Sequence, residues 1–298
     1  MSCCCRSASN RADIFLLAVA LAMAWVLAGC PKPAGEPVTL KVMSYNLRHN
    51  VDWWEQRFPL IADEIVRLRP DLIGLQEVQV AIGQESTLDD LIRARDASLD
   101  YHIYRELKSG VAAATGEGIA IFSLQPQGQV GKQDLSEGRV AIRARIEVAP
   151  GLAVDFFTTH LDASGDDVYR WPQVQDVVRF VDLNDEGQLA LLTGDFNSTD
   201  DTRVIQHVVD SGFVDSFKEL HGAATAELGA TSPIVLRQQP GEQNPTRRID
   251  FVFARAARLA KLEALASVVV GNNPDAQGLY PSDHLGVLTT LRATPATE

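Results

Sequence analysis

Apolar and polar positions along the chain predict strands and helices in turn from Val38 onward. Residues 40–45 alternate in the way that is typical of a strand. The apolar residues between 58 and 68 recur at helical spacing until Pro70, where a helix must end. Residues 71–76 then form a short apolar run, which indicates a buried strand.

Three more helices and several strands follow from the same patterns. One helix is predicted over residues 204–209 and is ended by Gly212. A helix is predicted from residue 87 to about 97, with Ser86 as its N-cap. Another is predicted to begin near Tyr169 or Trp171, with Pro172 in its first turn. Further strands are predicted at residues 118–123, 140–147, 154–159, 189–193, 249–254, 264–270 and 284–291.

The alternation continues without an internal repeat or a second linker, so residues 38–293 are expected to form one domain, followed by a short tail at 294–298. Many strands with intervening helices predict an α/β or α+β fold with two packed sheets. The weakly patterned stretch 218–246 is expected to lie outside the core, as a functional or mobile loop.

The N-terminus has the order of a secretory signal. Arg6 and Arg11 precede residues 14–28, an uninterrupted run of 15 apolar residues. The run is shorter than the roughly 18 residues that span a bilayer, which predicts a signal peptide at residues 1–29. The following Leu-Ala-Gly-Cys resembles a bacterial lipoprotein signal, in which Cys30 would be acylated. A signal anchor or a chance cysteine is the alternative.

The cysteines and prolines agree with an anchored domain. All four cysteines lie at or before Cys30, so the folded part can contain no disulfide, cysteine-bound metal or cysteine nucleophile. Three prolines within residues 31–37 predict a stiff spacer after the lipidated cysteine. We therefore expect a monomer without an obligate protein partner, lipid-anchored at the periplasmic or extracytoplasmic face of a bacterial cell envelope.

Composition excludes several classes of protein. The 298 residues are 46% hydrophobic and 22% charged, which excludes a disordered or collagen-like chain. The formal charge is −12, and without residues 1–29 it becomes −13, because 25 basic and 38 acidic residues remain. This charge disfavours tight binding of duplex DNA through its phosphates, although it does not exclude a nuclease.

Polar residues that suit metal chemistry stand at the ends of the predicted strands. Each alone has an ordinary explanation as a turn residue, a solvated strand end or a helix cap. Together they offer carboxylate and amide oxygens with two histidines and no cysteine, which favours Mg²⁺ or Mn²⁺ over structural zinc. The strand-end residues are Asn46, Glu77, His160, Asp195, Asn197, Asp250, Asp283 and His284.

A hard metal ion beside a His and Asp pair can catalyse phosphoester hydrolysis, because the metal polarises the phosphoryl oxygen while a base activates water. The signatures of P-loop ATPases, serine hydrolases with a Gly-x-Ser-x-Gly elbow and His-Glu-x-x-His zinc proteases are absent from the sequence.

Six segments, in order, resemble the endonuclease/exonuclease/phosphatase superfamily of metal-dependent phosphohydrolases. The resemblance implies a four-layer sandwich of two mixed sheets flanked by helices, with the active site at the strand ends along one edge. The segments are Ser44-Tyr45-Asn46-Leu47-Arg48, Leu75-Gln76-Glu77-Val78, Thr158-Thr159-His160-Leu161-Asp162, Thr193-Gly194-Asp195-Phe196-Asn197-Ser198, Arg248-Ile249-Asp250-Phe251-Val252 and Pro281-Ser282-Asp283-His284.

The resemblance also implies a metal site. Glu77 would be the principal Mg²⁺ ligand, with Asn46 beside it and Asp283 close enough to ligate or orient. Asp250 would hydrogen-bond one nitrogen of His284 and fix its tautomer.

The resemblance likewise implies a phosphate site. His160 and Asn197 would contact phosphate oxygens, and Asp195 would position or deprotonate the attacking water. Whether Asp195 or the pair of Asp250 and His284 acts as the base stays open at this level.

Three arginines are candidates for contact with a substrate phosphate. Arg48 stands where the DNA-repair branch of the family typically has an acidic residue, which counts against repair of apurinic sites. Arg170 begins an Arg-x-x-Gln arrangement that a solvated helix start would explain equally well. Arg248 has Arg247 beside it, and only one of two adjacent strand residues can face a cleft.

The sequence thus predicts a Mg²⁺- or Mn²⁺-dependent phosphodiesterase, nuclease or phosphomonoesterase. Its substrate would be a nucleic acid, a nucleotide, a sugar or inositol phosphate, or a lipid headgroup. The alternatives are a non-catalytic envelope lipoprotein that uses the fold as a binding module, and a structural Ca²⁺-binding domain. The closest EF-hand-like stretch, residues 162–167, lacks the closing glutamate that the second alternative needs.

Overall fold

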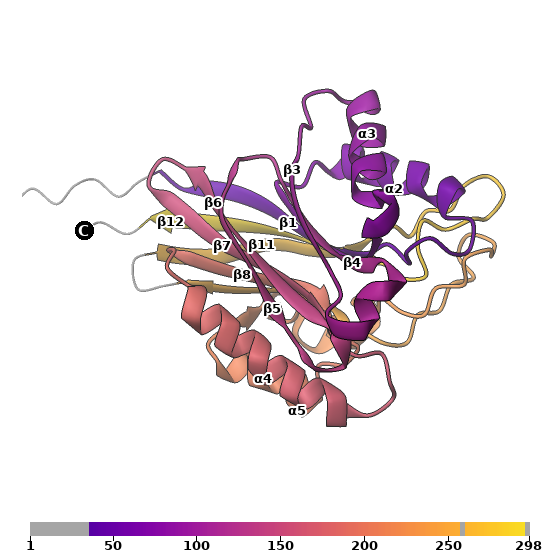
Figure 1. Cartoon of the computed structure of the whole chain (residues 1–298). Helices are drawn as coiled ribbons and strands as arrows, with labels where there is room; N and C mark the ends of the chain where they lie inside the picture. The colour runs from indigo at the N-terminus through magenta and orange to yellow at the C-terminus, as the bar shows by residue number, and fades with distance from the viewer. Residues whose placement is uncertain (1–35, 257–259, 296–298) are drawn as a thin grey trace, which may run out of the picture.

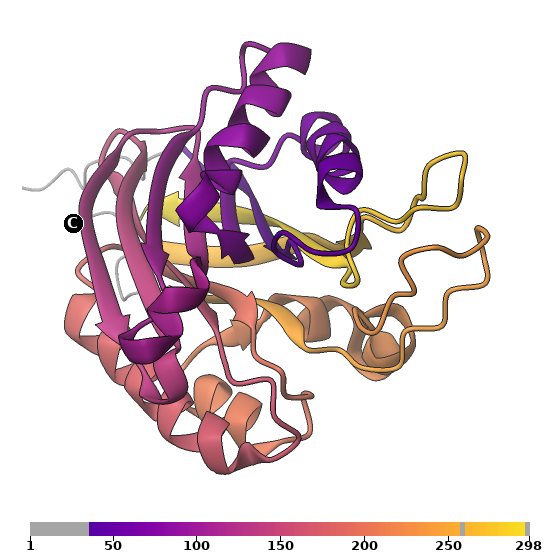
Figure 2. The ribbon, with the colours of Figure 1, turned by 45° about the vertical axis from the view of Figure 1, so that its right-hand side comes forward.

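A computed structural model describes residues 36–256 and 260–295. The predicted signal peptide and Cys30 lie outside the described residues. Within them, no helix combines the length and the apolar character needed to cross a bilayer. The described chain forms two six-stranded mixed sheets packed face to face with helices outside, as Figures 1 and 2 show. The predicted two-sheet architecture is confirmed.

Sheet A has the strand order β11-β12-β1-β2-β4-β3. Only β1 and β2 are parallel neighbours, and the other pairs are antiparallel. Its strands are β1 (Val38–Asn46), β2 (Leu72–Gln79), β3 (His102–Leu107), β4 (Glu117–Ser123), β11 (Ala260–Val270) and β12 (Gly286–Pro295).

Sheet B has the strand order β5-β6-β7-β8-β10-β9. Here β7 and β8 are the parallel pair, so each sheet has a parallel pair at or beside its centre. Its strands are β5 (Gln127–Asp134), β6 (Val140–Ala149), β7 (Leu152–His160), β8 (Leu189–Asp195), β9 (Val214–Asp215) and β10 (Asp250–Ala256).

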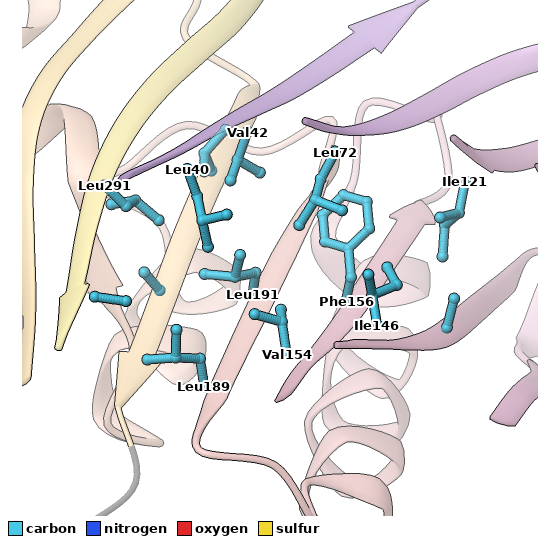
Figure 3. Close-up of a cluster of buried hydrophobic side chains, with 14 of the residues drawn as sticks. Leu40, Val42, Leu72, Ile121, Ile146, Val154, Phe156, Leu189, Leu191 and Leu291 are labelled. Carbon is cyan, nitrogen blue, oxygen red and sulfur yellow. The ribbon is translucent and has the colours of Figure 1, made fainter. Parts of the chain in front are cut away.

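The main core lies between the two sheets, and side-chain alternation explains why. In β1, Leu40 and Val42 point to the opposite face from Met43 because successive strand residues alternate. They meet Phe156 and Leu191 from sheet B, as Figure 3 shows.

Each outer sheet face is covered by helices. Helices α2 (Trp54–Leu68) and α3 (Gln84–Arg95) pack on sheet A through an apolar cluster that includes Phe58, Leu88 and Ile92. Helices α4 (Asp167–Asn184) and α5 (Arg203–Asp210) pack on sheet B. The remaining short helices are α6 (Ser216–His221), α7 (Thr225–Leu228), η1 (Val80–Ile82), η2 (Gly110–Thr115), η3 (Ser136–Gly138) and η4 (Gly222–Ala224).

Two predicted helix starts are wrong. Helix α3 begins at Gln84 after Gly83, whose φ of 71° is favourable only for glycine, so Ser86 lies inside the helix and caps nothing. Helix α4 begins at Asp167, because the Asp166 side chain accepts a hydrogen bond from the Val168 amide. Pro172 therefore stands in the second turn instead of the first.

The expectation that 218–246 lies outside the core is wrong in part. Helices α6 and α7 fall in or at the edge of this stretch. Ile234 packs with Tyr280 and Leu285 in a small buried cluster. The amide of Tyr280 donates to the carbonyl of Leu236, so this loop is tied to the loop that precedes His284. Figure 2 shows both long loops, orange and yellow, projecting side by side.

Candidate active site

The polar strand ends of the two sheets meet at one edge of the sandwich. Asn46 ends β1 in sheet A, and His160 and Asp195 end the parallel strands β7 and β8 in sheet B. Asp250 begins β10, which runs antiparallel to β8 and places Asp250 directly opposite Asp195. Loops at such an edge are where rigid scaffolds hold catalytic groups. The eight residues predicted from the strand ends all lie in this region.

Asn46 joins the two sheets at the site. Its Nδ2 atom donates to Oε1 of Glu77 at 3.1 Å and to Oδ2 of Asp195 at 3.0 Å, and its side chain is completely buried. The Asn46 Oδ1 atom accepts from the Arg48 amide at 2.9 Å, which fixes the orientation of the side-chain amide. One amide thereby holds two carboxylates together.

Glu77 reaches the site through an irregularity in β2. The register with β4 shifts between Leu75 and Val78, and Glu77 has a φ of 52°. Bulges of this kind aim a side chain away from the regular ladder. Burial raises the pKa of Glu77, and the nearby charge of Glu117 adds to the rise.

His284, Asp250 and Asp195 form a buried triad. Nδ1 of His284 lies 2.9 Å from Oδ2 of Asp250 and 3.8 Å from Oδ2 of Asp195. Burial opposes a charge on the imidazole, but Asp250 and Asp195 outweigh it and raise the pKa of His284 to about 10. Burial and the charge of Asp250 also raise the pKa of Asp195 to about 7. The predicted contact between Asp250 and His284 is present.

His160 and Asn197 lie on the other side of Asp195. Nδ2 of Asn197 donates to the Leu161 carbonyl at 3.2 Å and lies 3.3 Å from Nε2 of His160. Because Nδ2 is a donor, Nε2 must be the acceptor, which assigns the neutral His160 proton to Nδ1. Burial, with further cations nearby, lowers the pKa of His160 well below its usual value.

Asp283 is held by an arginine from the loop after β1. Nη1 of Arg48 lies 2.6 Å from Oδ2 of Asp283, and Nε of Arg48 donates to Asp52 at 2.7 Å. Arg48 is about one-third exposed, so its guanidinium borders the site and keeps solvent access. The Ser282 hydroxyl donates to the Asn46 carbonyl at 2.7 Å, which ties the Asp283 segment to β1.

The donor set suits a hard divalent cation. Two groups of residues have ligand atoms within 4.8 Å of one another: Glu77 with His160 and Asp195, and Asp195 with Asp250 and His284. Oδ1 of Asp250 is buried without a hydrogen-bond partner. Burial first, and then neighbouring carboxylates, raise the pKa values of Glu77 and Asp195, so the free protein disfavours negative charge on both groups. A bound cation would neutralise that charge.

The sequence comparison identifies the family. The model of the endonuclease/exonuclease/phosphatase family matches residues 43–284, from β1 to the segment that carries His284. The chain belongs to this family. Its members are phosphoester hydrolases that act as nucleases or phosphatases, and they typically use a divalent metal.

Individual relatives share the fold at low identity. Nocturnin from Drosophila melanogaster is 26% identical over 287 residues, which cover 82% of this chain but only 43% of the relative. The structure of D. rerio TDP2 with a single-stranded DNA product has a TM-score of 0.68 and 18% identity, and the match covers 85% of this chain and 98% of that one. The Bacteroides thetaiotaomicron mannosyl-6-phosphatase Bt3783 has a TM-score of 0.65 and 21% identity, with coverage of 85% and 99%. The fold alone therefore leaves the substrate of this family member open.

Arg170 and Arg248, which were also predicted to contact a substrate phosphate, already bind other protein groups. Arg170 is buried and donates to Asp167 at 3.0 Å and to the Asp162 carbonyl at 3.1 Å. Arg248 is buried, pairs with Asp215 and lies 4.3 Å above the ring of Phe251. This geometry gives no support to a phosphate contact by Arg248.

Sequence reasoning missed two residues beside the site. Glu117 begins β4, lies 4.0 Å from Nδ1 of His160 and pairs with Lys108 at 2.6 Å. Arg57 in α2 is completely buried. The sequence could have indicated this, because the charged residue directly precedes Phe58 on the apolar face of the helix. Both residues follow the rule that a charge at a buried position needs a partner.

Proposed function

We propose that this family member is a Mg²⁺-dependent phosphoester hydrolase, a phosphodiesterase or nuclease or a phosphomonoesterase, that works by in-line attack of water. The observation that supports it best is the position of Asp195, which contacts Asn46 from sheet A and faces His284 at 3.8 Å. Carboxylates from both sheets thus surround one point, beside a histidine with its own carboxylate partner.

Glu77 and Asn46 would hold the Mg²⁺ or Mn²⁺ ion, with Asp283 beside them. The bound ion would polarise a phosphoryl oxygen and neutralise charge that develops on it. Arg48 pairs with Asp283 through Nη1 and keeps part of its guanidinium exposed, so it would bring a second positive charge to the substrate phosphate.

His160 and Asn197 would bind the non-bridging phosphate oxygens. In the free protein Nδ2 of Asn197 lies 3.3 Å from Nε2 of His160, so both side chains are held at the place where a phosphate would enter. Nδ2 of Asn197 would donate to the phosphate directly, whereas His160 would donate through Nε2 only after its ring proton has moved there from Nδ1.

Asp195 would orient or deprotonate the attacking water, because it lies between Asn46 and His284. Asp250 would keep the His284 ring oriented through the contact at Nδ1, which leaves Nε2 of His284 free to face the substrate.

The location of the enzyme is a separate proposal. The signal-like residues 1–29 and Cys30 support a lipid anchor at the outer face of a bacterial membrane. Cys30→Ser should release the protein from the membrane fraction. If the variant stayed in that fraction, the lipoprotein proposal would be wrong.

The activity is tested with the full chain in a mild detergent. Bis(p-nitrophenyl) phosphate and p-nitrophenyl phosphate should be hydrolysed with Mg²⁺ or Mn²⁺, and EDTA should stop the reaction. His284→Ala should lose activity, whereas His102→Ala, which changes an exposed histidine on β3, should keep it. Equal inactivity of wild type and His284→Ala on both esters and on DNA, RNA, nucleotides, inositol phosphates and sphingomyelin would contradict the enzyme proposal.

A further inference from the structure

A cavity of about 680 Å³ opens beside Asn197. Its walls are the loop after β7 with the start of α4 on one side and the loop after β8 on the other. Arg247 closes a third side. The volume is in the range of small-molecule sites. We call this cavity the α4 pocket.

The α4 pocket adjoins the phosphate site because Asn197 belongs to both. The Asn197 side chain lies 3.3 Å from Nε2 of His160, and the backbone carbonyl oxygen of Asn197 accepts from Nη2 of Arg247 at 3.4 Å. A phosphate that contacts His160 and Asn197 would therefore have one of its ester substituents at the mouth of this pocket.

The wall chemistry argues against three kinds of substituent. No aromatic side chain lines the pocket, so a nucleobase would find no stacking partner there. Among the described residues, Ala163 is the only apolar side chain of the wall, so an acyl chain would remain unburied. Asp167 is paired with Arg170, but the exposed Asp166 carboxylate stands at the wall and would repel the next phosphate of a polyanion.

The same wall offers many neutral and charged hydrogen-bonding groups. Ser164 contributes a hydroxyl and the exposed Asp166 contributes a carboxylate acceptor. Other wall groups hold one another in place: the Ser198 hydroxyl donates to Asp167 at 3.2 Å, and the Thr202 hydroxyl donates to the Thr199 carbonyl at 2.8 Å. A wall that is mainly polar, with donors and acceptors mixed, suits a group that carries several hydroxyls.

Arg247 is the cation of the pocket that remains available. Arg170 already donates hydrogen bonds to Asp167 and to loop carbonyls, and these bonds fix the wall of the pocket. Arg247 is exposed, and within residues 36–256 and 260–295 it forms no ion pair. Its planar fork of donors can engage two neighbouring hydroxyls or a bridging ester oxygen.

We propose that the α4 pocket binds the polyhydroxyl part of a sugar or polyol phosphate, so that such phosphates are the substrates of the proposed hydrolase. This inference rests on the proposed function, because it assigns the phosphate to His160 and Asn197. Hydrolysis would break the bond between phosphorus and the ester oxygen, add the water oxygen to phosphorus and return the sugar hydroxyl with a proton.

The test compares substrates that differ in the ester substituent. Full-length protein with Mg²⁺ is given mannose 6-phosphate, glucose 6-phosphate, myo-inositol 1-phosphate, p-nitrophenyl phosphate, phosphocholine and a single-stranded oligonucleotide. At least one sugar or polyol phosphate should have a kcat/KM at least tenfold above those of phosphocholine and the oligonucleotide.

Two pocket variants connect the preference to the cavity. Ser164→Trp, which fills the pocket from an exposed loop position, and Arg247→Ala should each lower the ratio of kcat/KM for the sugar phosphate to that for p-nitrophenyl phosphate about tenfold, through KM. Arg179→Ala, on the exposed face of α4, is the matched control and should leave the ratio unchanged.

A binding measurement gives a second readout without turnover. Calorimetry in EDTA should show that Arg247→Ala weakens binding of the preferred sugar phosphate at least threefold more than binding of inorganic phosphate. Hydrolysis of p-nitrophenyl phosphate with no sugar preference, or with ratios that both variants leave unchanged, would overturn the pocket proposal alone. Faster cleavage of the oligonucleotide would also overturn it. Failure to hydrolyse any ester would instead contradict the proposed function.

Discussion

Nη1 of Arg57 lies 2.9 Å from the carbonyl oxygen of Pro281, although 224 positions separate the two residues. The same guanidinium donates to carbonyl oxygens of the loop after β1, among them Leu47 and Val51. Burial lowers the pKa of Arg57 to about 10, so it stays charged at neutral pH. One buried cation therefore joins the loop that carries Arg48 to the segment that carries Asp283.

Arg57→Met should destabilise the protein and disorder the site. Several buried carbonyls would lose their donor, which predicts a loss of about 3 kcal/mol or more in the free energy of unfolding, measured with urea. Arg57→Lys keeps the charge without the fork of donors and should recover only part of the stability. The control is Arg67→Met on the same helix, where the side chain is 58% exposed. Equal stability of both Met variants would rule out the joining role.

Asp250→Asn should impair activity more than stability. The change removes the charge that faces His284 at 2.9 Å and frees the imidazole to change its tautomer. Loss of such an orienting carboxylate predicts a fall in kcat of roughly 10–100-fold. The comparison is Asp182→Asn at the surface, which should leave kcat within twofold of the wild-type value.

Glu77→Gln should weaken metal binding while the fold persists. Its carboxylate is held by Asn46 at 3.1 Å and would be the main ligand, so the Mg²⁺ concentration for half-maximal activity should rise at least about tenfold. Thermal stabilisation by added Mn²⁺ should shrink in parallel. An unchanged metal requirement would show that the ion binds elsewhere. Glu55→Gln, exposed at the start of α2, is the control.

Without metal, the free energy of unfolding should fall as the pH rises from about 7 to 9, above the range in which the lowered pKa of His160 acts in the opposite direction. The folded-state pKa of Asp195 is raised to about 7 and that of His284 to about 10, so the folded state holds more protons than the unfolded state across this interval. The stabilisation from each group is fully present below the pKa that the group has in the unfolded state. It is lost as the pH rises through the pKa that the group has in the folded state. Urea unfolding in EDTA at several pH values measures the slope. Asp195→Asn should make the free energy of unfolding depend less on pH below about pH 8. A wild-type free energy of unfolding that rises with pH would contradict the raised pKa values of Asp195 and His284.

Gly74→Val should force the sheets apart next to the site. A Cβ atom at Gly74 would lie 2.0 Å from the Thr193 hydroxyl oxygen and 2.6 Å from that of Thr158. Overpacking of this kind costs about 1–3 kcal/mol. Activity should fall with stability, because Gln76 in the same strand donates to Thr158 across the interface. Gly165→Val, at an open loop position, should leave stability unchanged.

The buried strands could be predicted because their patterns report burial directly. The apolar runs of β2 and β8 are covered on both faces by the second sheet and the helices. The edge strands β3 and β5 were missed because they are half-exposed and carry polar residues in no clear alternation. Their strand state depends on pairing with β4 and β6, which a local pattern does not contain.

The strand-end residues could be assigned because each stands at one end of an apolar run and matches a family motif. Their distances could not, since the contact between Asn46 and Asp195 joins two sheets across 149 positions. Glu117 was missed because its surroundings come from other segments of the chain. For Arg247 and Arg248 the sequence could not decide which of the two faces the cleft, and the structure leaves Arg247 exposed while it buries Arg248. The α4 pocket is likewise made from three separate segments, so no single stretch of sequence indicates it.

The first strand also sets a direction for the whole molecule. Val38 pairs with Ala293, so the beginning and end of the domain are neighbours. Asn46 lies at the other end of the same nine-residue strand, about 27 Å away. Attachment of the chain before Val38 to a solid support or a membrane would therefore hold the domain at the end opposite its candidate active site. The catalytic edge would then stay open to dissolved substrates.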